Sequence, residues 1–539
     1  MSKEIEIEIS NIEFWITLAF LIVLAYWTFQ VTVPTNIVFG DEGFHTTLAR
    51  WIGTKLEYPK YIPFEGTNLR KTGYYRPPLW NLLEASFFAI FGNNELIPKI
   101  LNPVITFLTG LSIFILTFKI FRNEKLSLFA SILTVSLPTI LTYTVFFYYA
   151  NLLVFFSTLS ILLFFDYVKN NSWKSLILSS LFASLAFLTN QAGLALYLLI
   201  LIWFLKEVYE NRRLKNSWII SIFILIIVPL GFFVRNLVVY KAPVCYSIPY
   251  LGKFWSLDLC NINEMQEKYK FKGQAIPTGT EQNVFRFGLM NYLSFVYGNL
   301  LFTFLPFIFG FSLIYLRKEK IFIPLSLFLL FLLILFPKVS SRAEDTARYT
   351  ILWASTISFV AAFFYEYISQ EFEKSLPYSS FIIILIVLIL ASYYSISKLN
   401  SLKPLKYWSI SFIQACKWIS QNLPENSTIS TIWAHNAAFY SNRRIAGFYA
   451  DIALSNDLNY TLKFMKENGI DYLFIQKFSI DPLNRGYADN YPSNFVKMII
   501  NHPNIFVKVY ENGPPLENCL NGNCDGNVIY YINYTAAGF

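Results

Sequence analysis

Long apolar runs constrain this chain more than any other feature of its sequence. Ile321–Phe336 and Phe381–Leu390 are two examples, and similar runs recur as far as Ile396. A helix that crosses the hydrocarbon of a bilayer needs roughly 20 mainly apolar residues. Only 14% of the 539 residues are charged, whereas a soluble protein carries about 25%. The sequence therefore predicts a polytopic membrane protein with an all-α body.

Eleven segments are interpreted as membrane-spanning helices. They are Phe14–Val33, Leu96–Phe118, Leu126–Phe146, Leu152–Tyr167, Ser175–Leu188, Ala192–Leu205, Trp218–Val234, Asn291–Leu316, Ile321–Phe336, Tyr349–Ile368 and Pro377–Ile396. Pro78–Phe91 is also apolar, but it has only 14 residues and carries Asn81 and Glu84. A run that short is typical of an interfacial or re-entrant helix, so it is not counted. The residues before Phe14 are too acidic for a signal peptide, which makes the first span a retained anchor.

Basic residues are unevenly distributed over the short loops between these spans. The five loops on the side of the N-terminus carry 13 of them: Lys119, Arg122, Lys125, Lys169, Lys174, Lys206, Arg212, Arg213, Lys215, Arg317, Lys318, Lys320 and Lys374. The three short loops opposite carry only Lys338, Arg342 and Arg348. Positively charged loops stay in the cytoplasm. We therefore predict a multi-pass protein of the cell membrane with a cytoplasmic N-terminus. Its net charge of +9 is then a property of its inner loops and does not indicate nucleic-acid binding.

The predicted topology divides the chain into two domains. Residues 1–397 would form the transmembrane domain. Its outer face would carry a loop with interfacial helices at 34–95 and a second large loop at 237–290. Residues 398–539 contain no membrane-length run, and short helix-like and strand-like patterns alternate there. Such alternation is typical of a small α/β domain. The predicted topology places this domain outside the cytoplasm.

The five cysteines indicate which parts of the chain could face an oxidising compartment. Cys245 and Cys260 share one predicted outer loop, and Cys519 and Cys524 share a polar turn. If both places face an oxidising space, two disulfides are expected. Cys416 lies in an amphipathic helical stretch and would remain as a buried thiol. No Cys or His spacing indicates zinc.

Asp41 and Glu42 stand at the start of the first long polar loop. Acidic residues at the start of a helix cap its free N–H groups and suit its dipole, which is one interpretation of the pair. The other is that one carboxylate is a general base beside the bilayer. The length of the loop favours a functional role, and so do the cationic residues within it.

Arg76 is the cation at the end of that loop, directly before Pro77 and Pro78. The two prolines fix the backbone where the short apolar helix begins. A guanidinium held at headgroup depth suits a phosphate. The alternative is an arginine that reaches out to ordinary lipid headgroups.

These motifs resemble those of the GT-C superfamily of membrane glycosyltransferases. The residues DEGFH after the first span and YYRPPLWNLL beyond them are similar to the pattern of the family 39 and aminoarabinose-transferase-like enzymes. Looser matches are Arg235-Asn236 after Pro229 and Ala347-Arg348-Tyr349. The C-terminal stretch KWISQNLPENSTIS resembles an extracytoplasmic domain often found on such enzymes. The resemblance covers most of the chain and implies a GT-C-like fold.

The resemblance also implies an activity. A monosaccharide would move from a polyprenyl- or dolichyl-phosphate carrier to an acceptor hydroxyl, with inversion, on the outer face of the membrane. Asp41 would deprotonate the acceptor, and Glu42 would orient it or help to bind the sugar. Arg76 would hold the carrier phosphate, whose charge grows in the transition state. The acceptor would be a lipid-linked glycan, a lipid or a protein.

Further candidate substrate-binding residues follow from the same resemblance. Arg235 and Arg348, at outer ends of spans, are candidate second phosphate ligands, although interfacial anchoring is an equal alternative for Arg348. His45 and Tyr75 lie within the two motifs and complete this part of the set.

The chain departs from the family pattern at two outer turns. Related enzymes often carry an acidic residue near Asn151, and some use it as a metal ligand. An amide is a poor ligand for a divalent cation, so we predict no cofactor and leave a metal as the less favoured alternative. At the next outer turn Gln191 stands where a lysine is common. There is no Trp-Trp pair, which argues against transfer of whole oligosaccharides to protein.

Two other classes of protein fit a multi-pass chain with an outer domain. A transporter usually carries ionisable residues or broken helices at mid-membrane, whereas polar groups here gather at one surface. A glycan-binding receptor would explain the C-terminal domain but not the loop with its acids and Arg-Pro-Pro. We therefore favour the enzyme, which would bind a lipid-linked sugar, an acceptor and the lipid bilayer.

Overall fold

The computed structural model describes most of the chain. The described residues are 12–38, 40–64, 74, 76–147, 149–211, 216–240, 303, 305–335, 343–376, 378–407, 409–447, 457–483 and 490–539. For residues 40, 211, 333–335, 343–350, 354 and 447 the description covers the backbone only.

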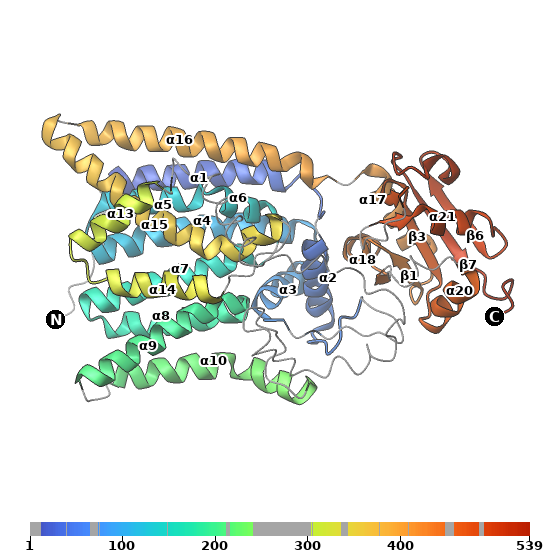
Figure 1. Ribbon diagram of the computed structural model, residues 1–539, viewed down its shortest axis with the longest axis horizontal. Coiled ribbons are helices and arrows are strands. Elements are labelled where there is room, and N and C mark those ends of the chain that lie inside the picture. The colour runs from blue at the N-terminus through green and yellow to red at the C-terminus, as the bar shows by residue number, and fades with distance from the viewer. Residues whose placement is uncertain are drawn as a thin grey trace.

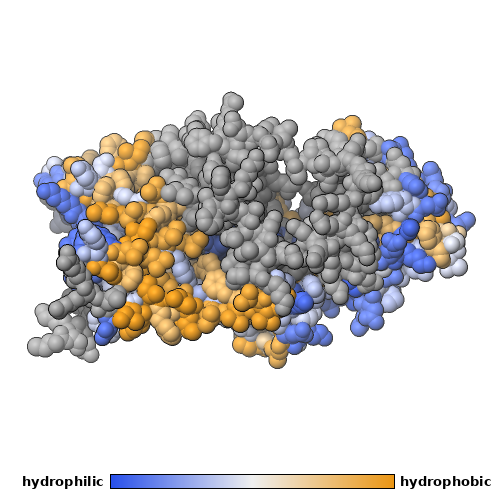
Figure 2. All heavy atoms as spheres, turned by 60° about the horizontal axis from the view of Figure 1, so that its bottom comes forward, coloured by the Kyte–Doolittle hydropathy of each residue, from blue (hydrophilic) through white to orange (hydrophobic). Residues whose placement is uncertain are grey.

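Apolar helices form an elongated bundle, in which they lie side by side (Figure 1). They are α1 (Ile12–Thr32), α4 (Leu96–Phe121), α5 (Glu124–Val135), α6 (Pro138–Val145), α7 (Ala150–Asn170), α8 (Trp173–Thr189), α9 (Leu194–Asn211), α10 (Asn216–Tyr240), α13 (Leu305–Leu316), α14 (Phe322–Leu335), α15 (Ala343–Ser375) and α16 (Ser379–Leu402). Hydrophobic residues also gather on the outside of this bundle (Figure 2). An apolar exterior is what a bilayer requires of a helical body.

The described helices include seven that are long and apolar enough to cross a membrane: α1, α4, α7, α9, α10, α15 and α16. The pair α5 and α6 is bent by 54° and would be an eighth span. The bend falls at Pro138, because proline has no N–H to continue the helix before it. Every predicted span coincides wholly or partly with a helix, but α8, α13 and α14 are short. The predicted count of eleven is therefore not confirmed.

Two helices of the predicted outer loop lie at one end of the bundle, beside the C-terminal part of the chain (Figure 1). They are α2 (Gly40–Lys55) and α3 (Leu79–Phe91). The 13 residues of α3 are too few to cross the hydrocarbon. The two helices touch through Gly53, where an added Cβ would lie 2.5 Å from the carbonyl oxygen of Ala85.

Residues 409–539, here called the C-terminal domain, contain a five-stranded sheet in the order β2-β1-β3-β7-β6. Its strands are β1 (Thr428–Thr431), β2 (Arg444–Gly447), β3 (Tyr472–Gln476), β6 (Phe506–Asn512) and β7 (Asn527–Ile532). β1 is parallel to β2 and β3, and β7 is antiparallel to β3 and β6. A second sheet pairs β4 (Ile480–Asp481) with β5 (Tyr491–Pro492). The helices are α17 (Ile410–Asn422), α18 (Ala434–Ser441), α20 (Leu458–Glu467) and α21 (Ser493–Ile500).

The sheet buries both of its faces, as strand β3 illustrates. Phe474 packs with Phe412 and Cys416 of α17 in one apolar cluster. Its neighbours Leu473 and Ile475 belong to a different cluster, which also contains residues of α20 and α21. Successive side chains of a strand point to opposite faces. Helices therefore cover the sheet on both sides.

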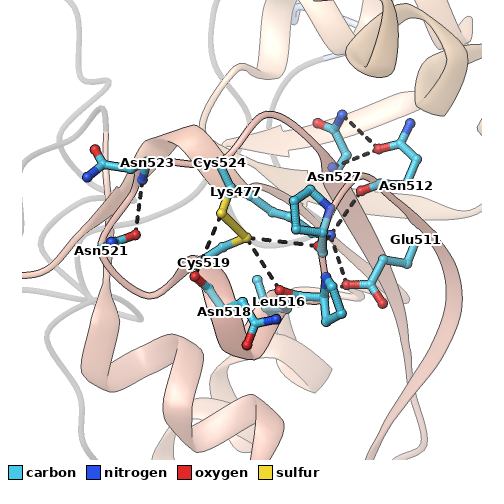
Figure 3. The surroundings of a disulfide bond; sticks show 12 residues. Lys477, Glu511, Asn512, Leu516, Asn518, Cys519, Asn521, Asn523, Cys524 and Asn527 are labelled. Atoms are coloured by element: carbon cyan, nitrogen blue, oxygen red, sulfur yellow. Dashed lines mark hydrogen bonds and ion pairs between the residues drawn. A yellow bond between two sulfur atoms is a disulfide. The ribbon is translucent and has the colours of Figure 1, made fainter.

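A disulfide joins Cys519 to Cys524, with the Cα atoms 5.5 Å apart, and this confirms one of the two predicted pairs. Beside it, the buried Lys477 forms an ion pair with Glu511 at 2.9 Å (Figure 3). Cys416 is a buried free thiol, as predicted. The other predicted pair, Cys245 and Cys260, lies outside the described residues.

Candidate active site

The side chain of Glu42, in the first turn of α2, contacts three separate segments of the chain. Its Oε1 accepts a hydrogen bond from the backbone N–H of Phe147 at 3.0 Å and forms an ion pair with Lys406. Its Oε2 accepts from the N–H of Val38 at 2.9 Å. The side chain is 0% exposed, so it has no surface left for a sugar. Glu42 holds the start of α2 in place, and this geometry does not favour the sugar-binding role that the resemblance implied.

Lys406 is the partner that the sequence did not reveal. It ends the short 3-10 turn Lys403–Lys406 that follows α16, and its side chain is 0% exposed. Its Nζ also lies 4.0 Å from the centroid of the Phe147 ring. A lysine just after a membrane span usually anchors the helix at the interface, so its position along the chain gave no signal of burial.

Asp41, His45 and Arg76 come together at this end of the bundle. Asp41 is partly exposed and Arg76 is exposed. The guanidinium carbon of Arg76 lies 4.7 Å from the centroid of the Phe44 ring. The charges of Arg76 and Asp41 both act on the pKa of His45, in opposite directions. The structure thus places the head and the end of the predicted loop beside one another.

His45 connects α2 to α3. Burial lowers its pKa to about 4, and the positive charge of Arg76 adds to this shift. The imidazole is therefore neutral at pH 7. Its Nδ1 lies 2.7 Å from Oδ1 of Asn81, and because that oxygen only accepts, Nδ1–H is the donor. His45 is 3% exposed, so it contributes by holding α2 against α3.

Glu84 is a second buried acid in this region. It lies on α3, one turn after Asn81, and is 0% exposed. Burial raises the pKa of Glu84 from 4.5 to about 8, and the Thr46 hydroxyl on α2 only partly offsets this. The carboxyl group is therefore mainly protonated at pH 7.

We expect Glu84→Gln to stabilise the protein increasingly as pH rises above 4.5. The folded-state pKa is raised, so the folded form keeps a proton that the unfolded chain loses, and stability falls as pH rises from 4.5 towards 8. Glutamine has no such proton, and the gain near pH 8 should reach at most about 4 kcal/mol. Thermal unfolding of purified protein at pH 5 and pH 8 measures it. The exposed Glu57→Gln is the matched control, and an equal change at both pH values would contradict this account.

The remaining predicted site residues lie in different surroundings. Arg235 donates to the carbonyl oxygens of Pro59 and Tyr74 at 2.7 and 3.0 Å, and its guanidinium lies 4.5 Å from the Tyr58 ring centroid. It therefore fastens the loop between α2 and α3 to α10, a contact that differs from the predicted phosphate ligand.

Asn151 is buried inside the bundle. Its Nδ2 donates to the hydroxyls of Thr106 and Thr144 at 2.9 and 2.7 Å, which places it in a buried polar cluster of the bundle. Gln191 is partly buried in a 3-10 turn before α9. Tyr75 lies outside the described residues. Arg348 lies on α15, but its side chain is not described.

His435 is the second residue that sequence reasoning missed. Its ring lies 5.3 Å from that of Phe44, and its charge acts on the pKa of His45. Among the described residues, no three His, Cys, Asp or Glu side chains are grouped as metal ligands, and the metal prediction stays untested.

Comparison with known proteins gives one family match. Residues 75–233 match the family of dolichyl-phosphate-mannose-protein mannosyltransferases. The match begins just before Arg76 and runs into α10. No curated protein matches the chain significantly.

Solved structures match over nearly the whole chain. An oligosaccharyltransferase from Archaeoglobus fulgidus superposes with a TM-score of 0.62 and 10% identity, over 86% of this chain and 69% of that one. ArnT from Cupriavidus metallidurans, bound to undecaprenyl phosphate, superposes with a TM-score of 0.60 and 11% identity, over 97% of this chain and 98% of ArnT. The mycobacterial arabinofuranosyltransferase AftD superposes with a TM-score of 0.56 and 11% identity, over 96% of this chain and 41% of AftD. At these identities the matches show a shared fold. With the family match, they confirm the predicted resemblance to GT-C membrane glycosyltransferases.

Proposed function

We propose that this protein is an inverting glycosyltransferase that moves one sugar from a polyprenyl- or dolichyl-phosphate carrier to an acceptor hydroxyl. The observation that carries the proposal is that Arg76 lies against the ring of Phe44, three residues after Asp41, and that both charges act on His45, at the end of an apolar bundle. One is an accessible carboxylate and the other an accessible guanidinium. Together they supply a base and a phosphate ligand where a lipid-linked substrate would arrive.

The comparisons support the choice of donor. The matching family is described by dolichyl-phosphate-mannose. ArnT was solved with undecaprenyl phosphate, and the Archaeoglobus oligosaccharyltransferase AglB with a peptide and a dolichol-phosphate. ArnT and this chain also cover one another almost completely. A single sugar on a polyprenyl phosphate is therefore the donor we favour.

The reaction follows from the two exposed groups. Asp41 accepts the proton of the acceptor hydroxyl as its oxygen attacks the anomeric carbon. The bond from that carbon to the phosphate oxygen breaks, and the electron pair leaves with the polyprenyl phosphate. Arg76 stabilises the negative charge that gathers on this leaving group. Attack opposite the leaving group inverts the anomeric centre.

The buried residues keep these two groups in place. Glu42 fixes the first turn of α2, from which Asp41 projects, through Val38, Phe147 and Lys406. Arg235 holds the outer loop against α10. Catalysis by positioning requires that the reacting groups be held in a fixed geometry, and these buried contacts would provide it.

We also propose that this end of the molecule faces away from the cytoplasm. The Cys519–Cys524 disulfide supports this placement, because disulfides persist in oxidising compartments. The acceptor would then reach the site from the aqueous side and the carrier from the bilayer.

We expect Arg76→Ala to raise the apparent KM for the lipid-linked donor about tenfold or more, because a charge-assisted hydrogen bond to the phosphate is lost. Arg76→Lys should recover part of the loss, since the charge remains and the bidentate geometry does not. The matched control is Lys55→Ala, which removes an exposed cation from the last turn of α2. Steady-state kinetics with purified protein give the values. Unchanged donor dependence in Arg76→Ala would remove Arg76 from the site.

A further inference from the structure

The C-terminal domain is bound directly to the start of the candidate catalytic loop. On α18, Asn436 donates to the carbonyl oxygen of Ile37 at 3.0 Å, and the Tyr440 hydroxyl accepts from the N–H of the same residue at 2.8 Å. From the other side, the buried Arg50 of α2 donates to the carbonyl oxygen of Phe439 at 3.0 Å. Buried polar contacts of this kind fix one relative arrangement of the two parts.

The closest approach of the two parts lies beside Asp41. A Cβ added to Gly43 would lie 2.9 Å from both the carbonyl carbon of His435 and the amide nitrogen of Asn436. Real Cβ atoms do not come so close to backbone atoms. The first turn of α2 and the first turn of α18 are therefore in backbone contact, two residues after the candidate base.

The side chains at this contact form a chain that ends at the candidate phosphate ligand. The ring of Phe44 is buried. The His435 ring packs against it at 5.3 Å and 69°. The Arg76 guanidinium lies 4.7 Å from the same ring, and Phe64 lies 6.0 Å from it. Edge-to-face ring pairs and cations over aromatic rings are both favourable.

We propose that the C-terminal domain completes the candidate site by supplying His435 as a positioning residue. His435 holds the ring of Phe44, and that ring holds Arg76 where the carrier phosphate binds. The inference rests on the proposed function for the role of Arg76. It extends that function by making the C-terminal domain a part of the donor site.

We attribute the positioning of Arg76 by His435 to the shape of the His435 ring. Among the contacts described, His435 meets Phe44 and Phe64 with its ring at steep angles, and a phenyl group can reproduce this packing. Replacement by phenylalanine keeps the ring packing against Phe44 and Phe64, whereas replacement by alanine removes it.

Full-length protein with His435→Ala, His435→Phe or His502→Ala tests the proposal. His502 is the control, because it lies in the same domain and its Nδ1 is 2.8 Å from the carbonyl oxygen of Met498, outside the cluster. We expect His435→Ala to raise the donor KM about three- to tenfold, with kcat and acceptor KM nearly unchanged. His435→Phe and His502→Ala should resemble the native protein. Gel filtration and Tm would show that all three are folded.

Two results would overturn the proposal. One is an unchanged donor KM in a folded His435→Ala protein. The other is an equal loss in His435→Phe, which would assign the effect to the imidazole and not to its packing. Equilibrium binding of undecaprenyl phosphate to the same variants, without turnover, separates this inference from the proposed function. If the native protein binds the lipid but transfers no sugar, the proposed reaction is overturned. Weaker lipid binding by His435→Ala would still support the positioning role of His435. Native protein that fails to bind the lipid would overturn both.

Discussion

Asp41→Asn is expected to abolish sugar transfer without disturbing the fold. The amide has nearly the shape of the carboxylate but cannot accept the acceptor's proton. Loss of a general base costs typically 10²–10⁴-fold in rate. Asp41 is partly exposed, and the buried contacts of this turn are made by Glu42, so the change should leave Tm within about 2 °C of the native value. Transfer of labelled sugar by purified protein measures the effect.

Glu57→Gln provides the control for this substitution. Glu57 is exposed and lies just beyond α2, so its loss changes the net charge of the loop equally. It should retain full activity. A folded Asp41→Asn protein that transfers sugar at more than about a tenth of the native rate would contradict the assignment of Asp41 as the base.

Breaking the ion pair between Glu42 and Lys406 is expected to have the largest effect on stability. Lys406→Met leaves the Glu42 carboxylate buried without its countercharge. Removing one partner of a buried pair typically costs about 3–5 kcal/mol. The pair joins α2 to the segment that leads into the C-terminal domain, so the loss should also loosen the site. Thermal unfolding and limited proteolysis of purified protein would report both consequences.

Two further variants isolate the pair. Lys403→Met removes an exposed lysine from the same 3-10 turn and should change Tm little. The double variant Glu42→Gln with Lys406→Met removes both charges and should recover part of the stability. Additive losses in the double variant would show that the two residues do not stabilise the fold as a pair.

The helices could be predicted from the sequence because apolar runs report burial in lipid directly. The alternating patterns after residue 398 likewise coincide with β1, β3, β6 and β7. Strand β2, with four residues that begin at Arg444, and helix α18 were missed. Both are short, and their structure depends on β1 and α2, which lie far away along the chain. The number of crossings was harder to predict, because α8, α13 and α14 are helices shorter than a span.

The candidate site was predicted in part. The acids at the head of the loop and the arginine at its end carried a recognisable spacing, and the structure places Asp41 and Arg76 near one another. Lys406 and His435 gave no such signal, since each acquires its role by packing against α2 from hundreds of residues away. Asn151 is another residue whose contacts the sequence did not indicate. Its amide donates to the hydroxyls of Thr106 and Thr144, which lie on other helices.

Transfer of sugar by the purified protein tests the central claim most directly. The protein would be incubated with a panel of labelled polyprenyl-phosphate sugars and a native membrane extract, with Asp41→Asn protein in parallel. We predict that label from one donor appears in an acceptor with inverted anomeric configuration, and that the variant gives none. Failure of every donor to label any acceptor, or equal labelling by the variant, would contradict the account.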